Sequence, residues 1–169
     1  NGHLNFYAGE TAKTFDELRL LKNYMSLNCD DFQGSTWAPH LIHKEVWNKV
    51  GGFSVEFSPG TGSDPDLNMK LWKLGVRIFK GVSKSRVYHF GSVVTRQKEK
   101  NFFSITDTGN KGNKIFLKKC GITIRFFKKH YLRSDTKFEG SLKEPNKNIN
   151  YYLDLLKVKL TLFYIKLFN

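Results

Sequence analysis

The sequence predicts an α/β fold followed by a helical C-terminal extension, and three observations support this fold class. Apolar residues recur at helical spacing in several segments, among them residues 14–27 and 66–74. Short runs at 76–79 and 86–89 alternate or are continuously apolar, as strands are. After Thr95 the composition changes to a basic region that ends in a long apolar helix. A chain of 169 residues is long enough to bury one sizeable core.

The N-terminal part contains two predicted helices with a short strand between them. Residues 14–27 place apolar side chains at helical spacing. Residues 35–38 are expected to form a short strand, which Pro39 excludes from the centre of a sheet. The second helix covers about 43–50, where two consecutive glycines end it.

A glycine-containing loop at 53–62 leads into a helix whose start carries two carboxylates. Ser63 and Asp66 have the spacing of a capping box, and Pro65 suits a first helical turn. This construction would hold Asp64 at a loop–helix junction that is rigid behind and open in front. Simple capping is the competing interpretation, since acidic residues in a first turn gain roughly 0.3–1 kcal/mol from the helix dipole.

The helix at 66–74 is expected to bury one apolar face and to end at Gly75. The side chains expected on that face are Leu67, Leu71, Trp72 and Leu74. The two strand-like runs follow it.

The basic region is expected to divide into a loop, two short helices, a linker and a last helix. The loop covers 96–114, and the short basic helices cover 114–119 and 122–132. A linker at 134–148 precedes an apolar helix at 149–168, which lysines interrupt. Lysines interleaved with aromatic residues are typical of segments that anchor at a membrane surface, and a helical extension packed on the domain is the alternative.

Composition limits the possible classes of protein. Lys and Arg number 28 against 15 Asp and Glu, which gives a net charge of +13. Such a field attracts phosphates on nucleic acid, nucleotides or anionic lipids, and a solvated lysine-rich surface is the alternative. Cys29 and Cys120 follow no metal or redox spacing and are expected to be free thiols in a reducing compartment. Fifteen Phe, seven Tyr and three Trp exclude a disordered chain.

The chain shows no signal peptide and no run of the roughly 18–20 apolar residues that a membrane span needs. Because it begins with Asn1 rather than Met, we expect it to be a fragment of a longer protein.

Six short motifs follow one another between Gly34 and Arg96. They are GSTW at 34–37, LIHKEVW at 41–47, VGGF at 50–53, SDPDLNMKL at 63–71, LGVRI at 74–78 and VYHFGS at 87–92, with Thr95 after them. In this order they resemble the acceptor-side half of a family 2 glycosyltransferase of the GT-A type. The resemblance implies a partial GT-A fold, Rossmann-like and specific for nucleotide-diphospho-sugars, that lacks its N-terminal donor-binding half. An Asp-x-Asp motif upstream, which this family uses for metal and nucleotide, is missing from the sequence.

The resemblance also implies roles for individual residues. Asp64 falls on the general base that takes a proton from the acceptor hydroxyl during inverting transfer. Asp66 falls on a second acid, which would orient the acceptor. His89 falls on a histidine that binds the divalent cation, Mn²⁺ or Mg²⁺, on the diphosphate of the donor. The sequence departs from the family pattern at Ser63, where Glu is usual, and at Lys70, where Arg is usual.

Other candidates come from residue chemistry. Trp37 could stack on a sugar ring, and ordinary packing is the alternative. Arg96 could contact a diphosphate, and the alternative is an arginine in a solvated loop. His40 and His43 are spaced like metal ligands on a helix, but ordinary surface or core histidines are the better interpretation because no third ligand is near.

We therefore expect an inverting glycosyltransferase fragment that is inactive alone and that acts in cell-surface polysaccharide or glycolipid synthesis. Its partners would be a nucleotide-sugar donor, a saccharide or lipid-linked acceptor, and the membrane surface. Its parts would be an acceptor-side half at 1–95, a basic region at 96–148 and a C-terminal helix at 149–169. It would be cytoplasmic, at the inner face of the membrane. Two alternatives stay open: a non-catalytic glycosyltransferase-like scaffold, and a basic nucleic-acid-binding module, which the absence of a nucleic-acid motif disfavours.

Overall fold

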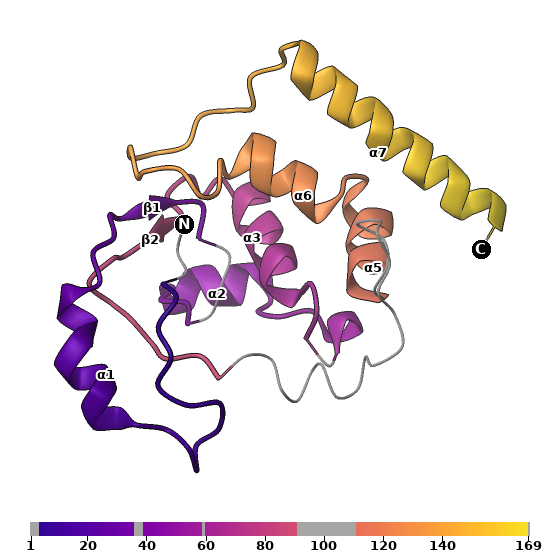
Figure 1. The fold of residues 1–169 in the computed structure, drawn as a ribbon. Helices are drawn as coiled ribbons and strands as arrows, with labels where there is room; N and C mark the ends of the chain where they lie inside the picture. Colours follow the sequence, from indigo (N-terminus) through magenta and orange to yellow (C-terminus); the bar gives the residue numbers. More distant parts are fainter. Residues whose placement is uncertain (1–3, 36–38, 59, 91–110, 169) are drawn as a thin grey trace.

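Helices surround a central helix in this protein, and a small sheet lies at one side (Figure 1). The computed structural model describes residues 4–35, 39–58, 60–90 and 111–168. The central helix is α3 (Ser63–Lys73). The other helices and strands are α1 (Glu17–Asn23), β1 (Phe32–Gln33), α2 (Lys44–Val50), β2 (Lys80–Gly81), α5 (Lys111–Cys120), α6 (Ile124–Phe126) and α7 (Ile149–Phe168). Shorter helical turns are η1 (Tyr24–Ser26), η2 (Val55–Phe57) and the π-helical η3 (Phe127–Tyr131).

The sheet consists of two strands from distant parts of the chain. β1 and β2 pair antiparallel, with Phe32 opposite Gly81 and Gln33 opposite Lys80. Lys137 adds an isolated bridge to Phe32. The described residues therefore form a mixed fold of helices with a small antiparallel sheet.

The sequence prediction placed the strands wrongly. Residues 76–79 and 86–89 form no strand, although β2 begins directly after the first of these runs. Ser35 lies outside β1, and the rest of the predicted strand at 35–38 lies outside the described residues. These short apolar runs have the composition of strands, but a ladder also needs a partner segment, which local sequence does not supply.

The helices were predicted more accurately. α2 begins after His43, whose ring accepts a hydrogen bond from the Glu45 amide, and it ends at Gly51 in the left-handed conformation. α7 has the predicted bounds, and the Asn148 side chain accepts from the Tyr151 amide at its start. The helix expected at 14–27 is confirmed as α1 with η1, although α1 buries none of its side chains.

α3 carries the main core. Its buried apolar side chains pack against residues from η2, α5, η3 and the segments on either side of them. This cluster contains Phe57, Leu67, Met69, Leu71, Trp72, Phe79, Phe116, Phe127, Leu132 and Leu142. Leu74, which the sequence placed on the same buried face, is 45% exposed because α3 has already ended at Lys73.

The guanidinium of Arg77 contacts the C-terminal end of α3. Arg77 donates to the carbonyl of Trp72 at 2.7 Å, and its guanidinium stacks on the Trp72 ring at 3.9 Å. One side chain thus satisfies a carbonyl in the last turn and covers an aromatic face.

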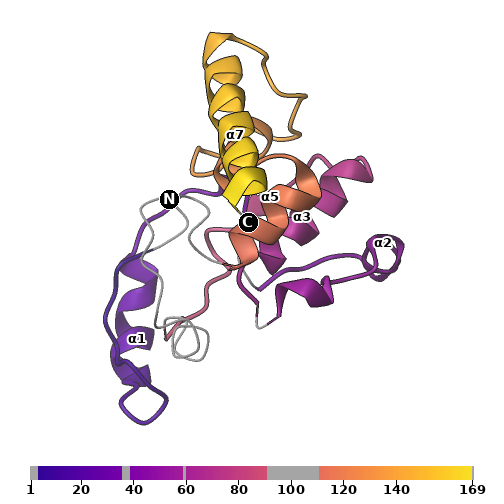
Figure 2. The ribbon, with the colours of Figure 1, turned by 90° about the vertical axis from the view of Figure 1, so that its right-hand side faces the viewer.

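A second cluster joins α7 to α5 and α6. It contains Leu117, Phe126, Tyr151, Val158 and Ile165, and the view in Figure 2 shows α7 beside α5. The two basic helices expected before it are present as α5 and as α6 continued by η3, and the linker at 134–148 contains no helix. α5 begins at Lys111, within the loop that was expected at 96–114, and residues 96–110 of that loop lie outside the described residues. α7 is therefore packed on the rest of the protein along one face. Among the helices of the described ranges, none has the length and apolar character to cross a bilayer.

The different surroundings of two leucines give a stability test. Leu71→Ala should lower the free energy of unfolding by about 2–5 kcal/mol, because it opens a cavity in the core. Leu74→Ala is the matched control and should change it by less than about 1 kcal/mol. Urea denaturation measures both values. Equal losses would contradict the observed end of α3.

Candidate functional site

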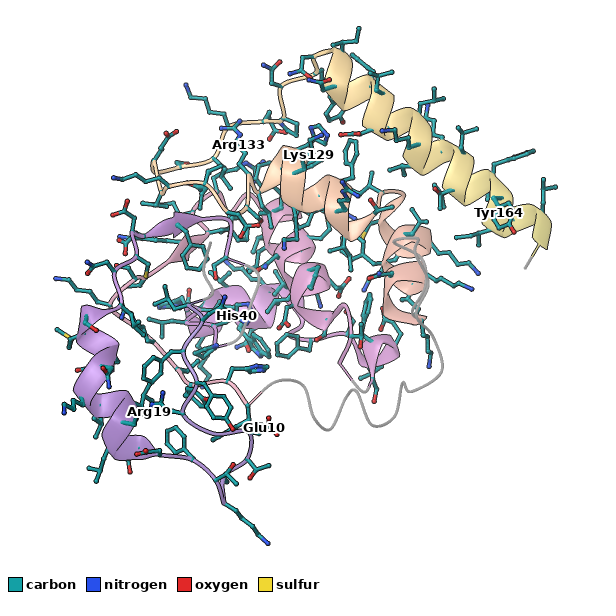
Figure 3. The ribbon with its side chains drawn as sticks, in the orientation of Figure 1. Glu10, Arg19, His40, Lys129, Arg133 and Tyr164 are labelled. Carbon is teal, nitrogen blue, oxygen red and sulfur yellow. The ribbon has the colours of Figure 1, made fainter. Side chains whose placement is uncertain are left out.

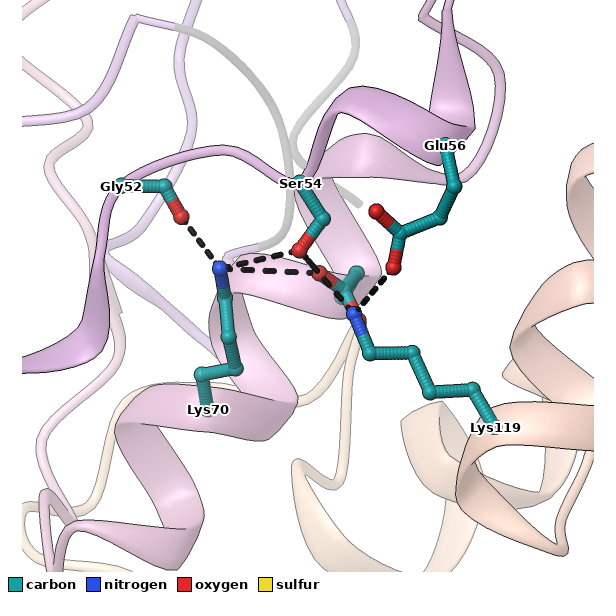
Figure 4. Close-up of polar contacts among 6 residues, drawn as sticks. Gly52, Ser54, Glu56, Lys70 and Lys119 are labelled. Atoms are coloured by element: carbon teal, nitrogen blue, oxygen red, sulfur yellow. Dashed lines mark hydrogen bonds and ion pairs between the residues drawn. The ribbon is translucent and has the colours of Figure 1, made fainter.

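The carboxylate of Asp66 is buried in a cluster of polar groups, since its side chain is 1% exposed. Figure 4 shows Ser54, Glu56, Lys70 and Lys119 of this cluster directed toward one another. Lys119 Nζ lies 2.8 Å from Oδ1 of Asp66, and Ser54 Oγ donates to Oδ2 of Asp66 at 2.6 Å. Lys70 Nζ lies 3.7 Å from Oδ2 and also donates to the carbonyl of Gly52. We call these residues, with Glu56, the Asp66 network.

Lys119 links α5 to the loop before α3. Its ammonium also lies 2.8 Å from a carboxylate oxygen of Glu56. Burial alone would lower the pKa of Lys119, but hydrogen bonds to Asp66 and Glu56 outweigh it and raise that pKa. The hydrogen bond from Lys119 in turn lowers the pKa of Glu56. The network therefore joins α3, η2 and α5 through charged groups.

The start of α3 differs from the predicted capping box. Ser63 is the first helical residue, and Gly62 precedes it in the left-handed conformation. The Ser63 hydroxyl donates to the Gly60 carbonyl at 2.7 Å, while the Asp66 side chain belongs to the network. The capping-box prediction was wrong because Ser63 lies one residue inside the helix, where Gly62 is the N-cap, and because Ser54 and Lys119 engage the Asp66 carboxylate.

α5 packs directly on this loop. A Cβ added to Gly112 would lie 1.9 Å from the carbonyl oxygen of Thr61, so only glycine permits the approach. α5 therefore packs closely against the loop that leads into α3.

Asp64 lies at the first turn of α3, in surroundings unlike those of Asp66. Its side chain is 28% exposed, and its Oδ1 is 3.9 Å from Nδ1 of His40. Burial raises the pKa of Asp64, and the positive charge of a protonated His40 partly opposes this shift. A half-buried carboxylate with a raised pKa is better suited to take up a proton than a solvated one.

His40 is the residue of this site that sequence reasoning missed. It precedes α2, is 15% exposed and lies well inside the outline of the molecule (Figure 3). Its Nε2 is buried without a hydrogen-bond partner among the described residues. Its ring also packs edge-on against Phe53. The sequence favoured its interpretation as an ordinary surface or core histidine over that as a metal ligand, and no local pattern linked it to Asp64.

His89 lies in an irregular segment that is anchored to the N-terminal region. The Tyr88 hydroxyl donates to the Gly9 carbonyl at 2.7 Å, and Tyr88 and Phe90 pack against Phe15. His89 lies between these two aromatic residues in the chain and is exposed. Asp64 itself lies against His40, which comes from a different part of the chain.

Among the described residues, no three His, Cys, Asp or Glu side chains come together as a metal site. The resemblance implied a divalent cation held at His89, and the residues that the structure describes do not form a ligand set for it. Trp37 and Arg96 lie outside the described residues.

A surface hollow of about 540 Å³ lies away from Asp64. Its lining residues come from the segments around β1 and β2 and from the linker, and include Asp31, Lys84 and Phe138. Ion pairing with Lys80 lowers the pKa of Asp31. This open hollow contains neither Asp64 nor His40, so we do not assign the site to it.

Compared with protein-family models, with curated proteins and with solved structures, the chain matches none of them.

Removing Lys119 should destabilise the protein. Lys119→Met leaves the Asp66 carboxylate buried, with Lys70 and Ser54 as its remaining partners among the residues that the structure describes. We expect a loss of about 2 kcal/mol of unfolding free energy, below the roughly 3–5 kcal/mol of a fully buried pair, because Lys70 remains and Lys119 is partly solvated. Lys118→Met, on the exposed side of α5, should leave stability within about 0.5 kcal/mol. Equal effects in denaturant titrations would refute the role of the network.

The raised pKa of Asp64 predicts a pH-dependent effect of Asp64→Asn. Because the folded state holds the proton more tightly than the unfolded state, the wild type loses stability as pH rises through the folded pKa. The difference in melting temperature, variant minus wild type, should therefore be larger at pH 7 than at pH 3.5. Asp154→Asn should show the opposite trend, since Lys129 and His130 lower the pKa of Asp154 to about 2. Trends of the same sign would contradict the assignment.

Proposed function

We propose that this chain forms the acceptor side of an inverting glycosyltransferase, with Asp64 as its general base. The observation that carries the proposal is the half-buried Asp64 carboxylate, whose pKa burial raises, at the first turn of a helix fixed from behind. The order of motifs between Gly34 and Arg96 supports the same assignment. The function rests on this chemistry and on the resemblance.

In the proposed reaction, Asp64 takes the proton of an acceptor hydroxyl while that oxygen attacks the anomeric carbon of a nucleotide-sugar. The bond from this carbon to the diphosphate oxygen breaks, its electron pair leaves with the nucleotide diphosphate, and the configuration inverts. A base whose pKa lies closer to the working pH accepts the proton with less penalty in the transition state. Burial of the carboxylate moves its pKa in that direction.

His40 would support Asp64 in this role. Its Nδ1 is 3.9 Å from the carboxylate, which is beyond a hydrogen bond but close enough for electrostatic interaction. After transfer Asp64 carries the proton, and His40 is a neighbouring base that could receive it after a small movement.

Asp66 has a different function in this proposal. A carboxylate that is 1% exposed and faces two ammonium groups offers no oxygen to a sugar hydroxyl. We therefore assign to it the positioning of the α3 start, in place of the acceptor contact that the resemblance implied.

The remaining assignments rest on the resemblance. A nucleotide-sugar would be the donor, and donor-binding residues outside this chain would complete the enzyme. A saccharide or a lipid-linked sugar would be the acceptor. Trp37 would stack on a sugar ring, and Arg96 would contact the diphosphate of the donor. The place of action would be the cytoplasmic face of a membrane.

Asp64→Asn tests the proposal in the enzyme completed by its donor-binding half. The amide keeps the shape of the side chain but cannot take a proton, so kcat for sugar transfer should fall about 10²–10⁴-fold. Release of labelled sugar to a panel of saccharide acceptors measures this rate. Asp30→Asn, which changes an exposed carboxylate 72% accessible to solvent, should leave kcat unchanged. Normal transfer by Asp64→Asn would reduce Asp64 to a residue that favours the helix start.

A further inference from the structure

The outward face of α7 is apolar and open. Eight large apolar residues on this helix are more than half exposed: Ile149, Tyr152, Leu153, Leu156, Leu160, Phe163, Tyr164 and Leu167. They recur at intervals of three and four residues, so they form one stripe along the whole helix. Figure 1 shows α7 along the outer edge of the protein, and Figure 3 places Tyr164 near its C-terminal end. We call this stripe the outer face of α7.

The opposite face of α7 is already occupied. Tyr151, Val158 and Ile165 are buried against Leu117 and Phe126. One side of the helix therefore holds it on the protein, and the outer face is directed away from the core.

Lysines border the outer face on both sides. At 3.6 residues per turn, Lys157 lies along one edge of the stripe, while Lys159 and Lys166 lie along the other. The only acidic residue of α7, Asp154, lies on the side toward the protein. There it contacts Lys129 at 2.6 Å and His130 at 2.9 Å, and its other oxygen lies 3.7 Å from the exposed ammonium of Lys157. The partner of the outer face therefore meets positive charge beside an apolar surface.

We propose that the outer face of α7 docks in the plane of an anionic lipid bilayer. Its leucines and aromatic rings enter the region between headgroups and acyl chains, and the bordering lysines reach lipid phosphates. The net charge of +13 adds attraction over a longer range. This inference does not depend on the proposed transferase activity.

Charge selects the bilayer over a second copy of this chain. Two outer faces packed together would bring the bordering lysines of each copy close to those of the other, and Asp154, the single acid of α7, is shared among Lys129, His130 and Lys157. An anionic bilayer supplies phosphates for the same lysines. An apolar stripe with cationic borders is the arrangement of helices that lie in a membrane surface.

Flotation with vesicles tests the docking. The intact chain is mixed with vesicles of phosphatidylcholine alone or with vesicles that also contain the anionic lipid phosphatidylglycerol. The chain should float with the anionic vesicles and much less with the neutral ones. Equal flotation with both, or none with either, overturns the proposal.

Two sets of variants locate the contact. Leu160→Ser with Phe163→Ser should abolish flotation, while Leu18→Ser with Leu21→Ser, a loss of exposed apolar surface on α1, should not. Lys157→Gln, Lys159→Gln and Lys166→Gln together should weaken binding to anionic vesicles about 100-fold. The control combines Lys13→Gln, Lys49→Gln and Lys143→Gln, three exposed lysines elsewhere, and should weaken it much less. Equal effects of both lysine sets would contradict docking through α7.

Sedimentation of the protein without lipid tests the alternative that the outer face of α7 binds a second copy of this chain. The proposal predicts a monomer for the wild type and for both α7 variants. A wild-type dimer that Leu160→Ser with Phe163→Ser dissociates would assign the outer face to a second copy and overturn the proposal.

Discussion

The buried carboxylate of Asp66 constrains the rest of this structure. An ionised side chain in the interior costs several kcal/mol unless charged and hydrogen-bonding partners surround it. Here the partners are Lys119 from α5, Lys70 from α3 and Ser54 from the loop before η2. Because these groups come from separate segments, satisfying one carboxylate fixes where α3 begins relative to α5 and to the loop.

This constraint gives the two acids of the motif different tasks. Residues two apart on a helix do not face the same direction, so the turn that buries Asp66 directs Asp64 elsewhere. Asp64 keeps a path to solvent and gains a neighbouring imidazole in His40. The same motif thus supplies an anchor and a carboxylate suited to proton transfer.

Sequence reasoning found the parts whose causes are local. α2 begins after the His43 cap and ends at Gly51, and α7 begins after the Asn148 cap. Each of these boundaries depends on a few neighbouring residues in the sequence. β1 forms through pairing with residues far away in the sequence, since Phe32 pairs with Gly81 and is bridged by Lys137. The predicted strand positions were wrong because local sequence does not show these partners. In the candidate site, Asp64 belongs to a motif and could be predicted. His40 and Lys119 reach the two carboxylates only through the fold, and no spacing indicated either contact.

The most direct measurement of this account is a carbon NMR titration of the side-chain carboxyl of Asp64 in the folded protein. The account predicts a titration midpoint above the ordinary value for aspartate, about 3.9, because burial disfavours the charged form. Asp154 in the same spectra should titrate at about 2 and serves as an internal reference. A midpoint for Asp64 at or below the ordinary value would show a solvated or ion-paired carboxylate, and the proposed base would lose its physical support.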